Sequence, residues 1–150
     1  MRSTEPERRS MAKVVVDANV IISAAFGGKP LEAFVRALED HEVYLSEAIA
    51  KELFGVVSGL SKKLSEDQLS FIQQKIQQLL TLARPVSLST HVVLSRDPKD
   101  DHYLSLCKET GAEFLVTGDK DLLSISQDKL RANGISCRIV TPQEFLEHVS

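Results

Sequence analysis

The features that this 150-residue sequence lacks exclude several classes of protein. Its two cysteines, Cys107 and Cys137, fit neither a disulfide framework nor the paired spacing of a zinc site, so we expect both to be reduced core residues. No apolar run approaches the roughly 20 residues that a membrane-spanning helix needs. Residues 1–10 are polar and lack the apolar segment of a signal peptide, and we interpret them as a disordered tail. A cytoplasmic location is therefore expected.

Signatures of nucleophilic and nucleotide-binding enzymes are also missing. The sequence has no Gly-x-Ser-x-Gly motif, no Walker loop and no zinc pattern, and no strand directly precedes the glycine pair at 27–28. Histidine is scarce, and we interpret His41 and His102 as surface residues with no part in a site. The net charge of −3 gives no global signal for nucleic acid, although 18 Lys and Arg residues are available to form a local cluster.

Short apolar runs alternate with amphipathic segments along the chain. Residues 13–17 include a continuous β-branched run, which is typical of a strand buried on both faces of a parallel sheet. Further strands are predicted at 43–45, 86–88, 113–117 and 138–140. Helices are predicted at 19–26, 30–40, 46–57, from 65 to Pro85, at 100–109 and from 142 onward. This order predicts one α/β domain over residues 11–150, built on a parallel sheet.

Acidic residues follow two of the strongest predicted strands. Asp17 comes directly after three valines, and Asp119 follows the run at 115–118. Because the carboxyl ends of parallel strands border one crevice, we expect these two side chains to face each other. Turn and cap formation would explain either acid alone, but two of them at neighbouring strand ends favour a functional site.

Two acids within predicted helices are candidates to join this pair. Glu52 borders the apolar stripe of its helix, and a carboxylate beside a buried face needs a partner or a cation unless it extends into solvent. Asp100 is placed on the inward face of a helical first turn, whereas Asp97 and Asp101 are explained by turn formation and capping. A carboxylate cluster without histidine favours a hard cation such as Mg²⁺ or Mn²⁺.

Four motifs of this sequence, taken together, resemble those of PIN-domain nucleases. They are Val-Val-Val-Asp17-Ala-Asn19, Glu52 within Ala-Ile-Ala-Lys-Glu-Leu, Asp-Pro-Lys-Asp100-Asp-His-Tyr-Leu, and Val-Thr117-Gly-Asp119-Lys-Asp121-Leu-Leu. Each motif is weak alone, but all four follow the family's order and spacing from residue 12 to about 145. The resemblance implies a three-layer α/β/α sandwich with a central parallel β-sheet. It also implies a metal-dependent endoribonuclease similar to the toxins of VapBC-type toxin–antitoxin pairs.

The resemblance also implies roles for individual residues. A catalytic quartet would bind Mg²⁺ or Mn²⁺, and its members are Asp17, Glu52, Asp100 and Asp119. Four residues would support these ligands, namely Asn19, Thr117, Asp101 and Asp121. Three basic residues are expected at the rim, where they would contact RNA phosphates or simply be solvated: Lys51, Lys99 and Lys120. The implied partners are an RNA substrate, an antitoxin protein and further copies of the chain in a homodimer or larger homo-oligomer.

Two other classes of function stay open. One is a catalytically inert PIN-like module that binds RNA or protein, against which the presence of all four acids argues. The other is a receiver-type regulatory domain, which also carries acids at strand ends. A receiver has an acid pair after its first strand and a central phosphoacceptor Asp, whereas here Asp17 alone follows the first strand and Glu52 lies within a predicted helix. The ribonuclease hypothesis accounts for more of these residues.

Overall fold

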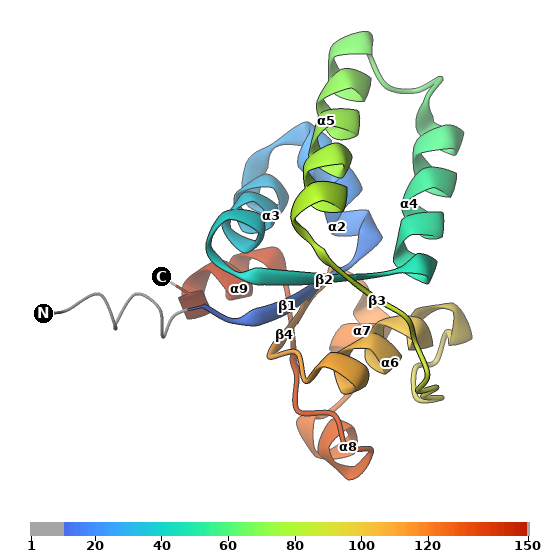
Figure 1. Cartoon of the computed structure of the whole chain (residues 1–150), viewed down its shortest axis with the longest axis vertical. Coiled ribbons are helices and arrows are strands. Elements are labelled where there is room, and N and C mark those ends of the chain that lie inside the picture. The colour runs from blue at the N-terminus through green and yellow to red at the C-terminus, as the bar shows by residue number, and fades with distance from the viewer. Residues whose placement is uncertain (1–10, 150) are drawn as a thin grey trace, which may run out of the picture.

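The computed structural model describes residues 11–149, and the tail predicted at 1–10 lies outside this range. A five-stranded, all-parallel sheet runs through the molecule in the order β3-β2-β1-β4-β5 (Figure 1). The strands are β1 (Lys13–Val16), β2 (Glu42–Ser46), β3 (Arg84–Val86), β4 (Phe114–Val116) and β5 (Arg138–Val140). The helices are α2 (Ala18–Ser23), α3 (Gly28–Asp40), α4 (Glu47–Leu60), α5 (Glu66–Leu82), α6 (Asp101–Thr110), α7 (Lys120–Leu123), α8 (Gln127–Ala132) and α9 (Pro142–Val149). Two 3₁₀ turns complete the list, η1 (Ala24–Phe26) and η2 (Pro98–Asp100).

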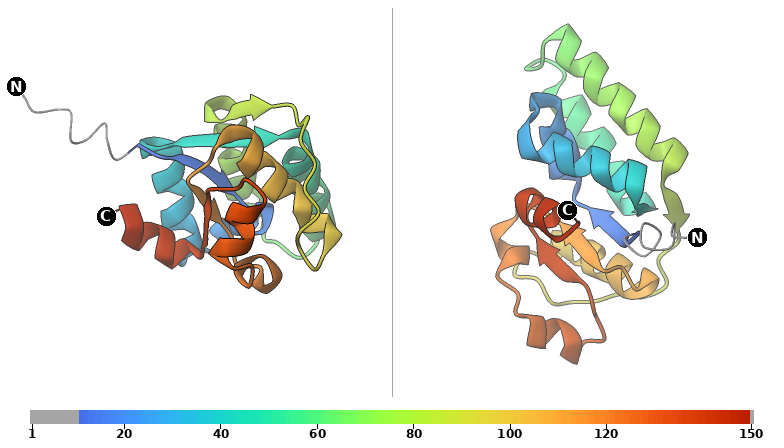
Figure 2. Two further views of the ribbon diagram at one scale, coloured as in Figure 1. Left: turned by 90° about the horizontal axis from the view of Figure 1, so that it is seen from below. Right: turned by 90° about the vertical axis from the view of Figure 1, so that its left-hand side faces the viewer.

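Helices cover both faces of this sheet. In Figure 1, α2 to α5 lie above the sheet and α6 to α8 lie below it, while α9 packs against α3. Figure 1 shows α4 and α5 extending from the sheet as a pair of long helices, and the right-hand view in Figure 2 shows α5 along its length. The predicted three-layer α/β/α sandwich with a central parallel sheet is therefore confirmed.

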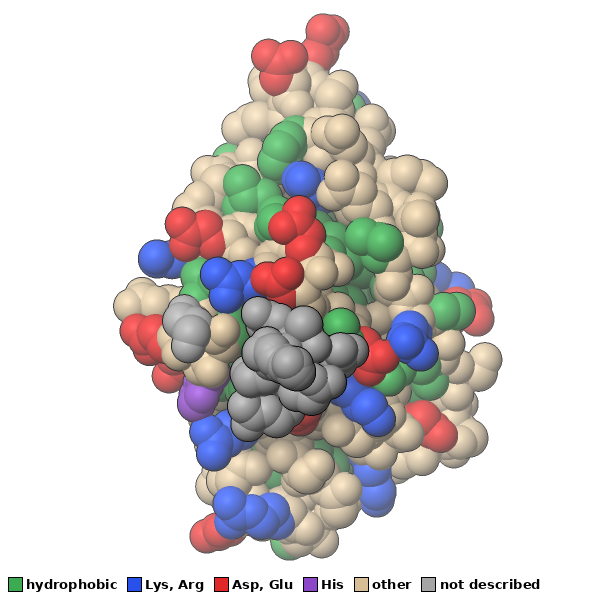
Figure 3. Space-filling model, turned by 60° about the vertical axis from the view of Figure 1, so that its left-hand side comes forward, with side chains coloured by type: hydrophobic (Ala, Val, Ile, Leu, Met, Phe, Trp, Pro, Cys, Tyr) green, Lys and Arg blue, Asp and Glu red, His purple; other side chains and the backbone are tan. Residues whose placement is uncertain are grey.

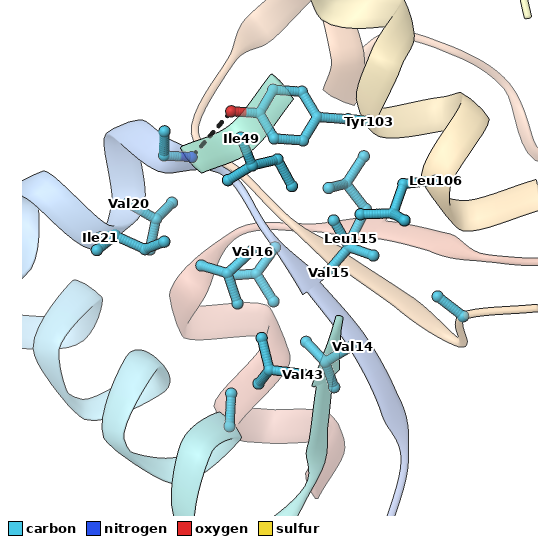
Figure 4. Close-up of a cluster of buried hydrophobic side chains, with 14 of the residues drawn as sticks. Val14, Val15, Val16, Val20, Ile21, Val43, Ile49, Tyr103, Leu106 and Leu115 are labelled. Atoms are coloured by element: carbon cyan, nitrogen blue, oxygen red, sulfur yellow. Dashed lines mark hydrogen bonds between the residues drawn. The ribbon is translucent and has the colours of Figure 1, made fainter. Parts of the chain in front are cut away.

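The central strand β1 is buried on both faces, as its β-branched sequence predicts. Val14, Val15 and Val16 are at most 2% exposed. Figure 4 shows them among side chains from α2, β2, α4, α6 and β4. Burying an aliphatic side chain of this size stabilises a fold by roughly 1.5–3 kcal/mol. The strand is thus a firm support for whatever follows its carboxyl end.

The ends of several elements differ from the prediction. Helix α4 continues through Gly59 to Leu60, beyond the predicted end at residue 57. The third strand is Arg84–Val86 and includes Pro85, which an edge strand tolerates because a backbone N–H on its outer side has no partner strand. Helix α8 was not predicted. Its N-cap is Ser126, whose hydroxyl accepts a hydrogen bond from the Lys129 backbone N–H.

Other sequence predictions concern single residues of the core. Cys107 and Cys137 are buried free thiols, as expected. His41 was expected at the surface, but it is only 8% exposed, and its Nδ1 accepts a 2.8 Å hydrogen bond from the Ala12 backbone N–H. Burial lowers the pKa of His41 below its ordinary value. Within residues 11–149, no helix is both long and apolar enough to cross a membrane.

Candidate functional site

The site lies at the point where the order of the strands reverses. From β1 the chain moves outward to β2 and β3, and it then returns to the other side of β1 to form β4 and β5. In parallel α/β sheets, ligands bind at the carboxyl ends of the strands that flank such a point. The strands here are β1 and β4, with Val16 paired to Val116. The next residues along the two strands, Asp17 and Thr117, are consequently neighbours.

Asp17 is held at this point by hydrogen bonds to both carboxylate oxygens. Its Oδ1 accepts the backbone N–H of Asn19 at 2.9 Å, which caps helix α2. Its Oδ2 accepts the hydroxyl of Thr117 at 2.7 Å. The residue is 2% exposed, and its own backbone N–H donates to the Val116 carbonyl. Asn19 thus acts through its backbone, while its side chain is exposed.

Thr117 connects Asp17 to the acid that follows β4. The Thr117 side chain is fully buried, and its hydroxyl accepts the Asp119 backbone N–H at 3.0 Å while donating to Asp17. Asp119 in turn caps α7, because its Oδ1 accepts the Asp121 backbone N–H at 2.7 Å. The Asp121 carboxylate pairs instead with Arg96, 3.3 Å away. Thr117 therefore fixes the relative position of the acids on β1 and β4.

Asp100 completes this side of the cluster. The pKa of its carboxyl is raised from 3.8 to about 7, chiefly by burial and then by hydrogen bonding with Asp119 and the negative charge of that residue. The negative charges of Asp97 and Asp17 also raise the pKa of Asp100. Among the described residues, Asp100 Oδ2 is buried without a hydrogen-bond partner. Two carboxyls placed in this way are stabilised by a shared proton or by a cation.

Glu52 reaches the cluster through Tyr103. The Tyr103 hydroxyl lies 3.1 Å from both Asp17 Oδ1 and Glu52 Oε2. It also accepts the Ala18 backbone N–H at 2.9 Å, the bond that is dashed in Figure 4. Burial, followed by the Asp17 charge, holds the pKa of Tyr103 far above its ordinary value, so the hydroxyl stays protonated. A hydroxyl carries a single hydrogen, and therefore it can donate to only one of the two carboxylates at a time.

His102 also contacts this network, which the sequence interpretation missed. Its Nε2 lies 3.1 Å from Glu52 Oε1, and its ring stacks at a tilt on Tyr103 with centroids 4.1 Å apart. Within the described residues, its Nδ1 is buried with no hydrogen-bond partner. The expectations that His102 is a surface residue and that no histidine lies near the acids are wrong. No local pattern indicates this contact, because it depends on how α6 packs beside α4.

The second acid of the Asp100-Asp101 pair has a different environment. Asp101 is 8% exposed, and its Oδ1 accepts the backbone N–H groups of Leu94 and Ser95 at 3.1 and 2.7 Å. These bonds hold the segment that enters η2 against α6. The Asp101 carboxylate is therefore engaged in hydrogen bonds to backbone N–H groups, whereas the Asp100 carboxyl interacts with Asp119.

The three lysines expected at the rim differ in their surroundings. Lys51 is 76% exposed and pairs with Glu47 at 3.1 Å on the outer side of α4. Lys99 and Lys120 are exposed at η2 and at the start of α7, each next in sequence to an acid of the cluster. On the face shown in Figure 3, basic and acidic side chains are interspersed and form no continuous basic surface.

The side chains present fit a hard divalent cation in chemistry, although they do not yet enclose one. Among residues 11–149, no three Asp, Glu, His or Cys side chains already stand at ligating positions around a common point. All four clustered acids nevertheless offer oxygen ligands, which Mg²⁺ and Mn²⁺ prefer. Among the described residues, Asp100 Oδ2 is buried with no hydrogen-bond donor. Asp17 and Glu52 share the single hydrogen of the Tyr103 hydroxyl, so one of these two carboxylates lacks that donor at any time.

The fold and the acidic cluster define an α/β/α protein with a carboxylate site at the strand switch point. The sequence model of the PIN domain family matches residues 13–121, well over half of the chain. This chain therefore belongs to the PIN domain family.

Solved structures with the same fold are distant in sequence. PAE2754 from Pyrobaculum aerophilum is 14% identical, with a TM-score of 0.56 over 92% of this chain and 89% of that one. VapBC2 from Rickettsia felis, solved bound to a DNA fragment from their promoter, is also 14% identical, with a TM-score of 0.52 over 85% of this chain and 98% of that one. Such likenesses show the shared fold alone. No curated protein matches the sequence.

Proposed function

We propose that this protein is a metal-dependent endoribonuclease in which Asp17, Glu52, Asp100 and Asp119 bind Mg²⁺ or Mn²⁺. The observation that carries the proposal is the convergence of four acids from four separate segments on the β1–β4 crevice. Two of these acids meet at one tyrosine hydroxyl, and a third has a buried oxygen without a partner. A stable fold tolerates such a cluster when a cation balances its charge.

Each part of the site has a separate task in the proposed reaction. A bound divalent ion supplies Lewis acidity, which activates water and neutralises charge on the phosphate. Asp17 is the most rigid acid, because three donors and a buried strand hold it. Thr117 keeps Asp119 in register with Asp17. Tyr103 and His102 orient the two oxygens of Glu52.

The electrostatics of the crevice also set a condition for binding RNA. Without a cation the four acids repel phosphate, so metal and substrate binding are expected to be linked. Lys51, Lys99 and Lys120 are proposed to contact the flanking phosphates. The Lys51–Glu47 ion pair is solvent-exposed and therefore weak, which leaves the ammonium group available to exchange partners.

We further propose that the chain is the toxin of a toxin–antitoxin pair and forms homodimers or larger homo-oligomers. The support is its PIN domain together with its similarity in fold to VapBC2 of Rickettsia felis. A neighbouring gene for a small DNA-binding protein that inhibits cleavage would favour this role over general RNA processing.

The experiment that tests the proposed activity is cleavage of single-stranded RNA with Mg²⁺, Mn²⁺ or EDTA. Cleavage is expected with either metal and not with EDTA. Glu52→Gln is expected to lower the rate about 100-fold, because the neutral amide no longer balances the cation. Glu39→Gln is the matched control on the exposed side of α3 and should cleave like the wild type. Activity in EDTA, or an unchanged rate for Glu52→Gln, would contradict the proposal.

Tyr103→Phe tests how the cluster is positioned. We expect this variant to fold but to bind Mn²⁺ about 10-fold more weakly, since residues that orient metal ligands typically contribute 10- to 100-fold. The free energy of unfolding should fall by about 1–2 kcal/mol, because the Ala18 N–H loses its buried acceptor. Tyr44→Phe changes the other tyrosine, on β2, and is the control. Equal Mn²⁺ affinity for both variants in a calorimetric titration would show that the hydroxyl does not position the acids.

A further inference from the structure

A cavity of about 410 Å³ opens directly beside the acid cluster. It shares Asp119 with the cluster, and Gly118 forms part of the same wall. Asn19 also lines the cavity and joins it to the site through its backbone hydrogen bond to Asp17. Whatever occupies this cavity therefore lies next to a phosphate held at the four acids.

The apolar walls of the cavity are rigid. Pro30, in the first turn of α3, and Pro142, the first residue of α9, each present a ring whose backbone torsion is fixed. Val20 of α2 adds a largely buried aliphatic surface to the lining. Walls of this kind offer flat or planar groups an apolar surface at little cost in side-chain entropy.

The polar groups of the cavity are neutral except for one. Asn19 and Ser23 contribute an amide and a hydroxyl, both on exposed positions of α2. Among the described residues that line it, none is basic and Asp119 is the charged one. The lining therefore disfavours a phosphate in the cavity itself and favours an uncharged group with hydrogen-bonding edges.

We infer that this cavity is the subsite for the base and ribose of the nucleotide adjoining the cleaved phosphodiester. A nucleobase has apolar faces and polar edges, which match the apolar walls and the two neutral polar side chains. Enzymes that hold an unstacked base place it between aromatic or apolar side chains and bind its edge by hydrogen bonds, and Pro30, Pro142 and Val20 supply the apolar surfaces here. The inference rests on the proposed ribonuclease function. It implies that the side chains of Asn19 and Ser23 determine which base is preferred next to the cleaved bond.

Ser23→Phe tests the subsite by filling it. Ser23 is exposed at the end of α2, and its side chain makes no capping hydrogen bond, so the fold should be retained. Ser70→Phe, at an exposed position of α5, is the matched control. On RNAs that differ at one nucleotide, the wild type and Ser70→Phe should prefer one base at a position flanking the cut. Ser23→Phe should raise KM about 10-fold and flatten that preference, with unchanged Mn²⁺ affinity.

A second measurement separates this inference from the activity itself. The four ribonucleosides, which carry no phosphate, are titrated into the full-length ¹⁵N-labelled protein. Shifts of the Gly118 and Asn19 amides, which line the cavity, are expected in the wild type and in Ser70→Phe, and they should be lost in Ser23→Phe. Absence of these shifts with every nucleoside at about 10 mM, or an unaltered base preference in Ser23→Phe, would overturn the subsite. Shifts in a protein that does not cleave RNA would support the subsite and overturn the nuclease function.

Discussion

Asp17→Asn is expected to reduce RNA cleavage by about 100- to 1000-fold, the largest activity loss of any single substitution in this chain. Asp17 is the acid that contacts the greatest number of other site residues, through Asn19, Thr117 and Tyr103. An amide in its place has one fewer negative charge and one fewer oxygen with which to hold a cation. Removing one preorganised electrostatic group from an active site typically costs two to three orders of magnitude.

The same substitution should leave the fold in place. Asparagine has the same shape, and its remaining oxygen can still cap α2 by accepting the Asn19 N–H. Its amide N–H₂ would meet the Thr117 hydroxyl, which can rotate to accept from it. We expect the free energy of unfolding to change by about 1 kcal/mol or less, because the lost hydrogen bond is offset by reduced repulsion among the acids.

Two measurements together make this prediction decisive. Cleavage rates are compared with melting temperatures recorded with and without Mn²⁺, because a bound ion raises the melting temperature of the protein that binds it. The wild type and Asp67→Asn, which changes an exposed acid of α5, should both cleave RNA and gain stability with Mn²⁺. Asp17→Asn should show neither property. Equal cleavage by Asp17→Asn and the wild type would reject the assignment of the site.

The sequence was most informative about the residues that follow strands. Asp17 and Asp119 were expected to meet because parallel strands place their carboxyl ends at one edge. The pairing of Val16 with Val116 places Asp17 beside Thr117, whose hydroxyl contacts both the Asp17 carboxylate and the Asp119 backbone N–H. Position along a strand is a local property that the apolar runs reveal directly. The family resemblance implied that Thr117 supports the ligands, and the structure adds the hydrogen bonds by which its hydroxyl links Asp17 to the Asp119 backbone.

The contacts between helices were beyond the reach of sequence patterns. The helix predicted at 100–109 included Asp100 in its first turn, but a 3₁₀ turn ends at Asp100 and α6 begins at Asp101. Periodicity gave no sign of this change in helical geometry, nor of the backbone groups that bury Asp101. The contacts of His102 and Tyr103 with Glu52 likewise arise from packing between α6 and α4, about 50 residues apart.

The second large effect concerns stability, and we expect the metal-free protein to lose stability as the pH rises from about 4 to 7. Burial and the neighbouring acids raise the pKa of Asp100 from 3.8 to about 7 in the folded state. Between these values the folded protein binds more protons than the unfolded chain, so the free energy of unfolding decreases with increasing pH. Above about pH 7 the Asp100 carboxyl is ionised in the folded protein, and the loss in the free energy of unfolding is then complete.

Asp100→Asn should remove this penalty. The carboxyl keeps some contact with water, so the gain is smaller than the full pKa shift implies, about 1–2 kcal/mol at pH 8. For a chain of this size, such a gain raises the melting temperature by about 2–6 °C. At pH 4 the wild-type carboxyl is itself protonated, and the two proteins should melt together. Thermal melts in EDTA across this pH range measure the difference.

Asp101→Ala provides a contrast at the adjacent position, because the two acids have opposite effects on stability. Asp101 accepts the backbone N–H groups of Leu94 and Ser95, so its removal should lower the melting temperature at both pH 4 and pH 8. Added Mn²⁺ at pH 8 should stabilise the wild type more than Asp100→Asn, since the ion replaces the missing proton between Asp100 and Asp119. If Asp100→Asn is instead less stable than the wild type at pH 8 in EDTA, the carboxyl is not under the electrostatic strain that its surroundings indicate.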